Sequence, residues 1–273
     1  MLKQRIFTAL LLLPLVLLAI FALPAYSFIG LVAFILLGGS WEYARLAGME
    51  SRVAIQSMVY LQATLFAALF FIRDQWSGIG PEMLSLFAAA WLLMFLRLFF
   101  YRADAVVDTR YKVLSYITAI VSISTGWMAI GWIAIQAKGS WFILLLLLIV
   151  WAADTGAYFA GKRFGKTRLA PLISPGKTRE GLVGGLLLAP VVASIAAKLM
   201  PLPGMDTLWL IPLCLLTVLA SAAGDLLISM HKRISGHKDS GKLLPGHGGI
   251  LDRLDSLIAA APFFALGLSV SGY

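Results

Sequence analysis

Long apolar runs recur along the whole chain, separated by short polar or glycine- and proline-rich breaks. Each run is about 20 residues long, the length that an α-helix needs to cross the hydrocarbon core of a bilayer. The runs are continuously apolar, which is typical of helical spans, whereas transmembrane strands alternate. The pattern predicts nine spans, at residues 5–23, 28–47, 53–72, 82–100, 113–136, 141–160, 181–200, 207–230 and 250–271.

The composition agrees with this pattern. Of 273 residues, 60% are hydrophobic and only 13% are charged, too few charges to cover the surface of a water-soluble domain. We therefore expect an all-α polytopic membrane protein, with residues 1–140 holding spans one to five and residues 141–273 holding spans six to nine with the polar loops. The first span is too long for a typical signal-peptide core, so we expect it to be retained. The single cysteine, Cys214, is interpreted as a packing residue.

The distribution of positive charge predicts the orientation. With the N-terminus in the cytoplasm and nine alternating spans, all but three of the 22 Lys and Arg residues fall on the cytoplasmic side. The exceptions are Arg73, Lys138 and Lys198. Such asymmetry is what the positive-inside rule demands. It places the loops after the sixth and eighth spans in the compartment that holds nucleotides.

Two polar motifs flank the loop after the sixth span. W-A-A-D-T-G-A-Y-F-A-G contains Asp154, and an acidic residue in a membrane segment is a functional candidate by default, although a structural ion pair would also explain it. In I-S-P-G-K-T-R-E-G, residues 173–181, Pro175-Gly176 predicts a tight turn. Lys177, Thr178 and Arg179 then offer donors where the next helix should begin, a favourable place for an anion. A solvated basic loop is the alternative.

The end of the eighth span carries a third motif, S-A-A-G-D-L-L-I-S-M-H-K-R, residues 221–233. Asp225, Ser229 and Lys232 follow at spacings i, i+4 and i+7, so they share one face of a helix. Gly224 would leave room beside Asp225 for a bulky group. Since a lone buried carboxylate is costly, we expect Asp225 to meet a cation, either a metal or a basic side chain of a neighbouring loop.

The most polar stretch of the chain is residues 236–256, G-H-K-D-S-G-K-L-L-P-G-H-G-G-I-L-D-R-L-D-S. Asp252 and Asp255 are three apart and open the last span, where the helix dipole favours carboxylates. Capping alone would not need the glycines and the basic residues around them. The candidates in this stretch are Lys238, Asp239, Ser240, Lys242, His247, Gly248, Gly249, Asp252, Arg253 and Asp255.

These groups are carboxylates, hydroxyls and cations, with one cysteine and three histidines in the chain. Hard oxygen ligands suit Mg²⁺ rather than Zn²⁺. No serine is obviously paired with a base, and the formal net charge is +9. The set fits phosphoryl or nucleotidyl transfer between anionic substrates at a membrane surface.

The pattern S-x-x-K-R-x-x-x-x-K-D-S-G-x-x-x-P-G-H-G-G-x-x-D-R-x-D, from Ser229 to Asp255, closely resembles the signature of the phosphatidate cytidylyltransferase (CDP-diacylglycerol synthase) family. D-T-G-A-Y-x-x-G and S-P-G-K-T-x-E-G upstream resemble the same family in the same order. The sequence departs from the usual pattern at Arg179, Ile228 and His231. Ile228 removes a possible carboxylate near the site, and His231 occupies a position that is usually apolar.

The resemblance implies that CTP and phosphatidate give CDP-diacylglycerol and pyrophosphate in phospholipid biosynthesis, with Mg²⁺, at the cytoplasmic face of an inner membrane. It leaves open whether a monovalent cation such as K⁺ joins Mg²⁺. A homodimer is suggested only by analogy, and no nucleic-acid partner is implied.

On this reading, we expect Asp225 and Asp252 to hold the metal, assisted by Asp255 or Asp154. The residues expected to act on the phosphates and the leaving pyrophosphate are Lys232, Arg233, Lys238, Asp239, His247 and Arg253. The residues expected to bind substrate are Asp154, Ser174, Lys177, Thr178, Glu180, Ser229, Gly248 and Gly249.

Two other classes remain to be weighed. A CTP-dependent polyprenol kinase would also need Mg²⁺ and a basic face, but it must activate a hydroxyl, and no base is plainly positioned for that. A transporter should carry polar groups through the bilayer midplane, and spans one to five offer almost none.

Overall fold

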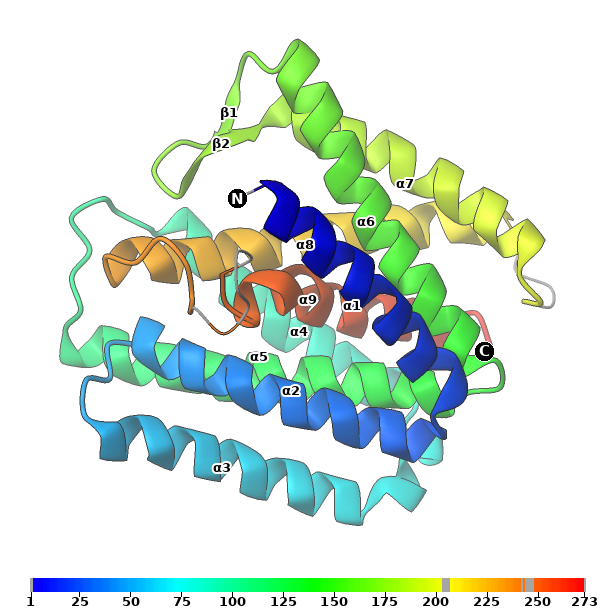
Figure 1. The fold of residues 1–273 in the computed structure, drawn as a ribbon, viewed down its shortest axis with the longest axis horizontal. Coiled ribbons are helices and arrows are strands. Elements are labelled where there is room, and N and C mark those ends of the chain that lie inside the picture. Colours follow the sequence, from blue (N-terminus) through cyan, green and yellow to red (C-terminus); the bar gives the residue numbers. More distant parts are fainter. Residues whose placement is uncertain (1, 203–206, 242, 244–247, 273) are drawn as a thin grey trace.

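The computed structural model describes residues 2–202, 207–241, 243 and 248–272, with the side chains of all of these except 2–11 and 207. Long helices account for most of these residues (Figure 1). The elements are α1 (Leu2–Ala22), α2 (Ala25–Leu46), α3 (Arg52–Phe71), the 3₁₀ turn η1 (Arg73–Gly78), α4 (Pro81–Phe99), α5 (Thr109–Ile135), α6 (Gly139–Phe164), β1 (Arg168–Ala170), β2 (Ser174–Thr178), α7 (Arg179–Leu199), α8 (Thr207–Ile234) and α9 (Leu251–Val270).

The helices confirm the all-α polytopic class. Eight of them, α2 to α9, are long and apolar enough to cross a membrane. The searched part of α1, Leu12–Ala22, is apolar but shorter. Among the described residues, helix ends differ from the predicted span ends by a few residues. The largest differences are four residues, at the start of α5 and at the ends of α6 and α8. The extensions of α6 and α8 carry polar residues of the predicted motifs.

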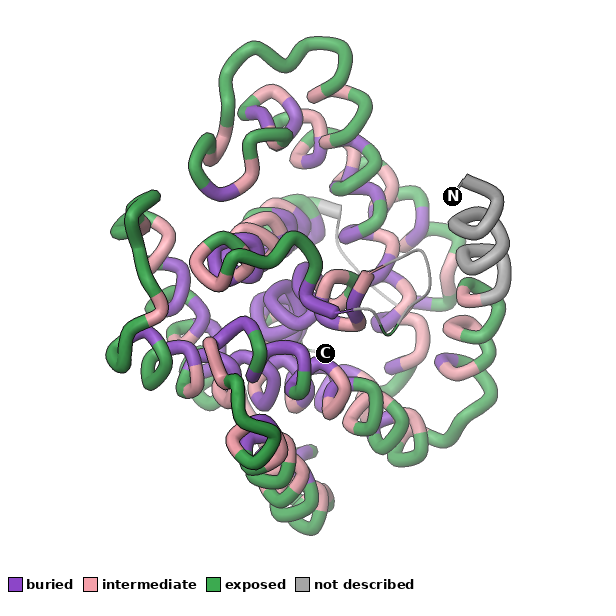
Figure 2. Tube along the Cα trace, turned by 60° about the vertical axis from the view of Figure 1, so that its left-hand side comes forward, coloured by how far each residue is buried: buried purple, intermediate pink, exposed green. Residues whose placement is uncertain are grey.

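Helix α9 lies in the middle of the bundle and packs against α2, α4, α5, α6 and α8. Figure 2 shows that buried positions gather in the interior, while the outward faces of the surrounding helices are exposed. Helix α9 therefore contacts helices of both predicted regions, α2, α4 and α5 of the first and α6 and α8 of the second. The division at residue 140 stays a prediction.

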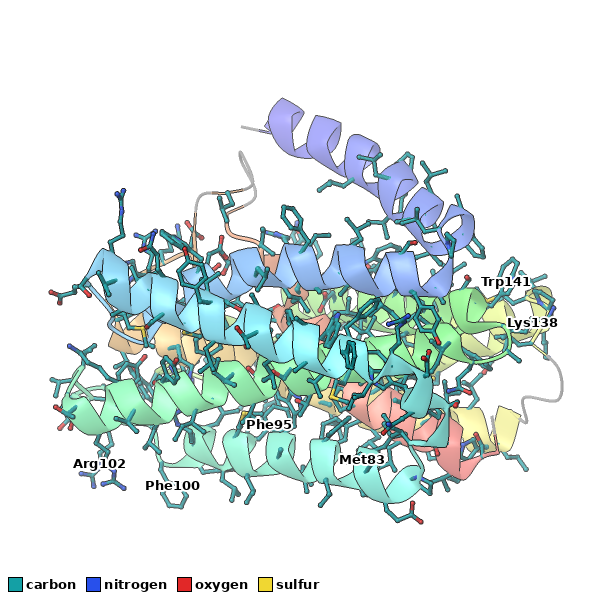
Figure 3. The ribbon with its side chains drawn as sticks, turned by 90° about the horizontal axis from the view of Figure 1, so that it is seen from below. Met83, Phe95, Phe100, Arg102, Lys138 and Trp141 are labelled. Atoms are coloured by element: carbon teal, nitrogen blue, oxygen red, sulfur yellow. The ribbon has the colours of Figure 1, made fainter. Side chains whose placement is uncertain are left out.

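Two loops that the predicted topology places on opposite sides of the membrane lie at opposite ends of the bundle. Arg102, after α4, and Lys138, before α6, lie toward opposite ends of the molecule (Figure 3). The sequence assigns Arg102 to the basic side and Lys138 to the other. Which side faces the cytoplasm stays a prediction.

Helices α6 and α7 cross at close range because glycines face each other. A Cβ on Gly156 would lie 2.5 Å from the carbonyl oxygen of Gly184, and one on Gly185 would lie 2.7 Å from that of Ala153. Small residues let helix backbones approach in a membrane, where dispersion contacts replace the hydrophobic effect. The two helices therefore diverge from one tight crossing, and the chain between them, residues 165–178, projects from the bundle (Figure 1).

That projecting chain is a β-hairpin, which the sequence analysis did not predict. β1 pairs antiparallel with β2, with Arg168 opposite Thr178 and Ala170 opposite Ser174. The expected tight turn at Pro175-Gly176 is wrong, since both residues lie in β2 and the turn falls at 171–173. Proline is tolerated at the edge of a sheet, and this sheet has only two strands.

Substitution of Gly184 by Leu should destabilise the α6–α7 crossing, because a Cβ there would lie 2.7 Å from the carbonyl oxygen of Gly156. We expect a loss of about 1–3 kcal/mol, the usual cost of overpacking, measured as a lower midpoint of thermal unfolding in detergent. Gly30→Leu is the matched control, because a Cβ on Gly30 meets nothing within 4 Å. Equal midpoints for the two variants would contradict the close crossing.

Candidate active site

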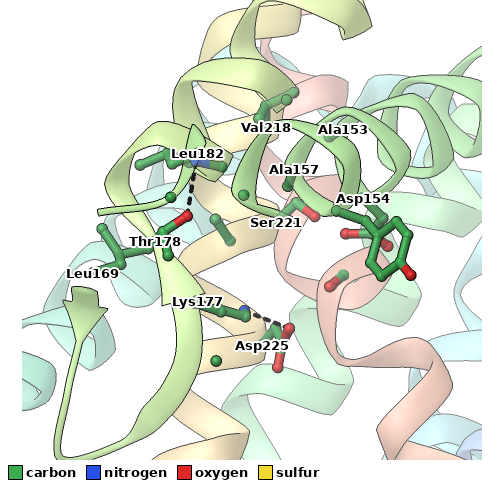
Figure 4. A pocket seen from close by; sticks show the side chains of 18 of the residues that line it. Ala153, Asp154, Ala157, Leu169, Lys177, Thr178, Leu182, Val218, Ser221 and Asp225 are labelled. Atoms are coloured by element: carbon green, nitrogen blue, oxygen red, sulfur yellow. Dashed lines mark hydrogen bonds and ion pairs between the residues drawn. The ribbon is translucent and has the colours of Figure 1, made fainter. Parts of the chain in front are cut away.

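A pocket of about 410 Å³ opens where the hairpin meets α6, α7 and α8. Asp154 of α6, Lys177 of β2 and Asp225 of α8 line it, and Figure 4 shows the three side chains directed into the same space. The volume lies within the range of about 300–1,000 Å³ that is common for small-molecule sites. Charged residues of three of the four predicted polar motifs thus meet at one pocket, and Ser256, the last residue of the fourth, also lines it.

An ion pair crosses this pocket. Nζ of Lys177 lies 2.5 Å from Oδ2 of Asp225, and the hydroxyl of Ser229 donates to Oδ1 at 3.2 Å. The expected cation for Asp225 is therefore a lysine here. Both charged side chains are about 30% exposed, so the pair contributes little to stability. Its significance is chemical, since it places a cation and a carboxylate where an anionic ligand can compete for one and a metal for the other.

Two further carboxylates lie near this pair. Asp154 is exposed at the pocket, whereas Asp255 of α9 is buried, 5% exposed, and accepts the backbone N–H of Ser256 at 2.7 Å. The charge of Asp225 acts on both carboxylates, as does that of Lys177. Helices α6, α8 and α9 thus each contribute one acidic residue to a common electrostatic environment.

Asp252 has a different set of partners. Its Oδ1 accepts Nζ of Lys232 at 2.7 Å, and its Oδ2 accepts the backbone N–H groups of Ser240 and Gly249 at 2.8 and 3.0 Å. Asp252 therefore holds the loop before α9 in place. Asp252 and Asp225 thus pair with different lysines, Lys232 and Lys177, and their pairing on one metal stays a prediction.

The predicted residues around the hairpin have structural partners. The Thr178 hydroxyl accepts the N–H of Gly181 at 3.1 Å and caps α7. Glu180 accepts the N–H groups of Lys166 and Thr167 at 3.1 Å, which fixes the entry to the hairpin. These bonds set the position of β2, and therefore of Lys177.

Other predicted residues are spread around the site. Arg233 donates from Nε to the carbonyl oxygen of Ile173 at 2.9 Å, so α8 holds the hairpin turn. Ser174 lies in β2, and Lys238 and Asp239 are exposed in the loop after α8. The charge of Arg253, which is exposed in the first turn of α9, acts on Asp154. Predicted residues His247 and Lys242 lie outside the described residues.

Glycines near the site are required by close contacts. Gly248 has a φ of +83°, and a Cβ there would lie 2.9 Å from Oδ2 of Asp252. The expectation that Gly224 leaves room for a ligand is wrong, since a Cβ on Gly224 would lie 2.8 Å from the carbonyl oxygen of Asp255. Gly224 instead lets α8 pack directly on α9.

The sequence analysis missed Glu42 of α2. This carboxylate is only 1% exposed and accepts hydrogen bonds from Ser240, Ile250 and Leu251, at the far end of the chain. The rule that singled out Asp154, an acidic residue within a membrane segment, applies equally to Glu42. The sequence therefore carries a signal for Glu42, an acidic residue within an apolar span.

The donor set is compatible with Mg²⁺. The described residues contain no group of three or more His, Cys, Asp or Glu side chains arranged to hold a metal by themselves. Mg²⁺ is commonly bound through one or two carboxylates together with waters and substrate phosphates. Asp225 meets that need because its carboxylate, half-exposed at the pocket, already binds a cation, the Lys177 ammonium.

Comparison with known proteins identifies the family. The model of the Cytidylyltransferase family matches residues 3–271. The phosphatidate cytidylyltransferase of Pseudomonas aeruginosa is 39% identical over 274 residues, covering 100% of this chain and 99% of that protein. The proteins of the same name from Haemophilus influenzae and Bacillus subtilis are 34% and 44% identical, covering 97% and 46% of this chain and 98% and 46% of their own lengths. The match extends through the first half, which the signature residues alone did not cover, and this chain belongs to the cytidylyltransferase family.

Proposed function

We propose that this multi-pass membrane protein transfers a cytidylyl group from CTP to phosphatidate, giving CDP-diacylglycerol and pyrophosphate. The names of its full-length relatives support the substrates. The excess of Lys and Arg residues on one side of the predicted spans supports a site on the cytoplasmic face of an inner membrane. The observation that carries the proposal is the Lys177–Asp225 pair, which sets a cation beside a carboxylate at a pocket that borders the apolar bundle.

The reaction needs little proton transfer. A phosphate monoester has a second pKa of about 6, so the phosphatidate oxygen is already largely ionised at neutral pH. This oxygen forms a bond to the α-phosphorus of CTP, and the bond from that phosphorus to the bridging oxygen of the β-phosphate breaks. Pyrophosphate leaves with the electron pair. The obstacle is the repulsion between two polyanions, which fixed positive charge reduces.

The side chains at the pocket meet that obstacle. Lys177 binds a phosphate oxygen when substrate displaces it from Asp225. Lys162 and Arg168, which also line the pocket, add positive charge at its mouth. Mg²⁺, when bound, neutralises phosphate charge and orients the triphosphate. Asp225 is the residue that would hold it, with Asp255 or Asp154 as the second carboxylate.

We assign the acyl chains of phosphatidate to an apolar groove beside the polar pocket. The groove has a volume of about 690 Å³ and runs between α4, the hairpin and α8. Leu169, Leu182 and Ala222 line both the groove and the polar pocket, so the two cavities are adjacent. A phosphatidate with its phosphate beside Lys177 would lay an acyl chain along the leucines and phenylalanines of the groove.

Asp225→Asn should lower CDP-lipid formation by about 100-fold or more, because the variant loses the carboxylate that pairs with Lys177 and would hold Mg²⁺. The assay uses CTP labelled on the α-phosphate and measures label in chloroform-soluble product. Asp104→Asn, at an exposed position in the loop after α4, is the control and should retain full activity. Near-normal turnover of a folded Asp225→Asn protein would remove Asp225 from the site.

A second label separates the proposed reaction from that of a lipid-alcohol kinase. The cytidylyltransferase should place the α-label of CTP in the lipid and release the γ-label as pyrophosphate. A kinase would transfer the γ-label instead and release CDP. Lipid that carries only the γ-label would therefore overturn the proposed function.

Ala223→Phe should obstruct the groove, since Ala223 lines the groove but not the polar pocket. Each buried methylene contributes about 0.8 kcal/mol, so displacing two should raise the KM for a long-chain phosphatidate on the order of 10-fold. A dihexanoyl phosphatidate should be affected much less. Ala89→Phe, at an exposed position on α4 outside the groove, is the matched control. Equal losses with both lipids would place the acyl chains elsewhere.

A further inference from the structure

A carboxylate from the first half of the chain organises the loop that carries the signature residues. Oε1 of Glu42 accepts the backbone N–H of Ile250 at 3.0 Å. Oε2 accepts the N–H of Leu251 at 2.9 Å and the hydroxyl of Ser240 at 2.8 Å. Among the ion pairs of the described residues, none involves Glu42. Within the described part of the chain, hydrogen-bond donors compensate its charge, and they come from the loop after α8 and from the start of α9.

These bonds replace a cap that the sequence around α9 does not supply. Ile250 precedes the helix and makes no side-chain capping bond. The first N–H groups of a helix have no partner within it and favour negative charge nearby. Glu42 accepts two of these N–H groups, and the hydroxyl of Ser240 accepts a third, from Asp252, at 3.3 Å. Helix α9 is therefore capped by residues distant in sequence.

The loop is shaped to let Glu42 approach. A Cβ on Gly241 would lie 2.9 Å from Cγ of Glu42 and closer still to its carboxylate, and a Cβ on Gly249 would also collide with that carboxylate. On the α2 side, a Cβ on Gly38 would lie 2.7 Å from Cδ1 of Ile250. Glycines on both partners thus create the space in which the hydrogen bonds form.

The loop that Glu42 holds also holds Asp252. Its carboxylate is held by the N–H groups of Ser240 and Gly249, and in turn it holds Nζ of Lys232. Ser240 is therefore shared, since its hydroxyl bonds to Glu42 while its N–H bonds to Asp252. A shift of the loop away from Glu42 would move the Asp252 carboxylate and the Lys232 ammonium together.

We propose that Glu42 is a positioning residue that acts through Ser240 and the start of α9 to fix Asp252 and Lys232 for the transfer reaction. The inference rests on the proposed function in one respect, that Asp252 and Lys232 serve the transfer. It assigns to α2 a direct part in site geometry, by way of three hydrogen bonds to residues about two hundred positions away in the sequence.

The test is Glu42→Gln, which keeps the shape of the side chain. Whichever way the amide is turned, its NH₂ group faces at least one backbone N–H donor, so at least one bond is lost. Residues that orient a site from behind typically contribute about 10–100-fold to activity. We expect a fall in kcat of that size with a smaller change in the KM for CTP.

Two measurements separate positioning from general destabilisation. The loss in Glu42→Gln should combine with that in Ser240→Ala to less than the product of the two, because Glu42 and Ser240 act on Asp252 through the same loop. Hydrogen exchange should accelerate at the amides of residues 249–252 and stay unchanged in α6 and α7. Ser40→Ala is the matched control, because Ser40 is fully buried on the same helix and its hydroxyl donates to the carbonyl oxygen of Leu36, within α2 itself.

The outcomes are distinct. Wild-type kcat in Glu42→Gln, a loss no larger than in Ser40→Ala, or fully multiplicative losses with Ser240→Ala would overturn the inference. If the wild-type chain in nanodiscs formed no CDP-lipid, the proposed function would fail. The exchange measurement would still decide whether Glu42 orders the loop, and unchanged exchange at 249–252 would overturn the positioning role by itself.

Discussion

The arrangement depends on the cost of leaving an ionised carboxylate without a partner beside a bilayer. Removing such a charge from water is expensive unless it meets a cation or several hydrogen-bond donors. Asp225 meets Lys177, Asp252 meets Lys232 and two N–H groups, and Glu42 accepts three hydrogen bonds from residues 240, 250 and 251. Because each carboxylate meets partners from outside its own helix, satisfying these charges ties the hairpin, α2, α8 and α9 to one another at a single end of the bundle.

The glycine-mediated crossing of α6 and α7 determines where one of these partners can lie. Two helices that approach this closely leave no room for the connecting chain between them, so residues 165–178 leave the bundle and return as a hairpin. Thr178 caps α7 at the return, and Glu180 holds the entry through Lys166 and Thr167. The strand before the cap then brings Lys177 over α8. A contact between lipid-embedded backbones thus fixes the position of a charge at the pocket.

The sequence predicted the helices well because a span is a local property, about 20 consecutive apolar residues. It also selected Asp154, Lys177 and Asp225, since charges are scarce and conspicuous in such a chain. It could not predict which of them pair, because that depends on how helices distant in sequence pack. The hairpin was misread for a local reason: a five-residue strand that contains Pro175 and Gly176 looks like a turn. Glu42 lies in an apolar region, and its partners are about two hundred residues away.

The departure at His231 shows that the first half of the chain adapts to the second. A fully buried histidine at a position that is usually apolar would be costly without polar neighbours. Tyr111 of α5 supplies one, with its hydroxyl 2.9 Å from Nδ1 of His231 and 2.8 Å from the carbonyl oxygen of Leu46. The ring of Tyr43 packs edge-on against the imidazole. Helices α2 and α5 therefore accommodate the side chain next to Lys232, and α2 also holds the loop before α9. Changes in the signature segment and in the apolar first half are for this reason expected to be coupled through packing, even where the first half reads only as membrane spans.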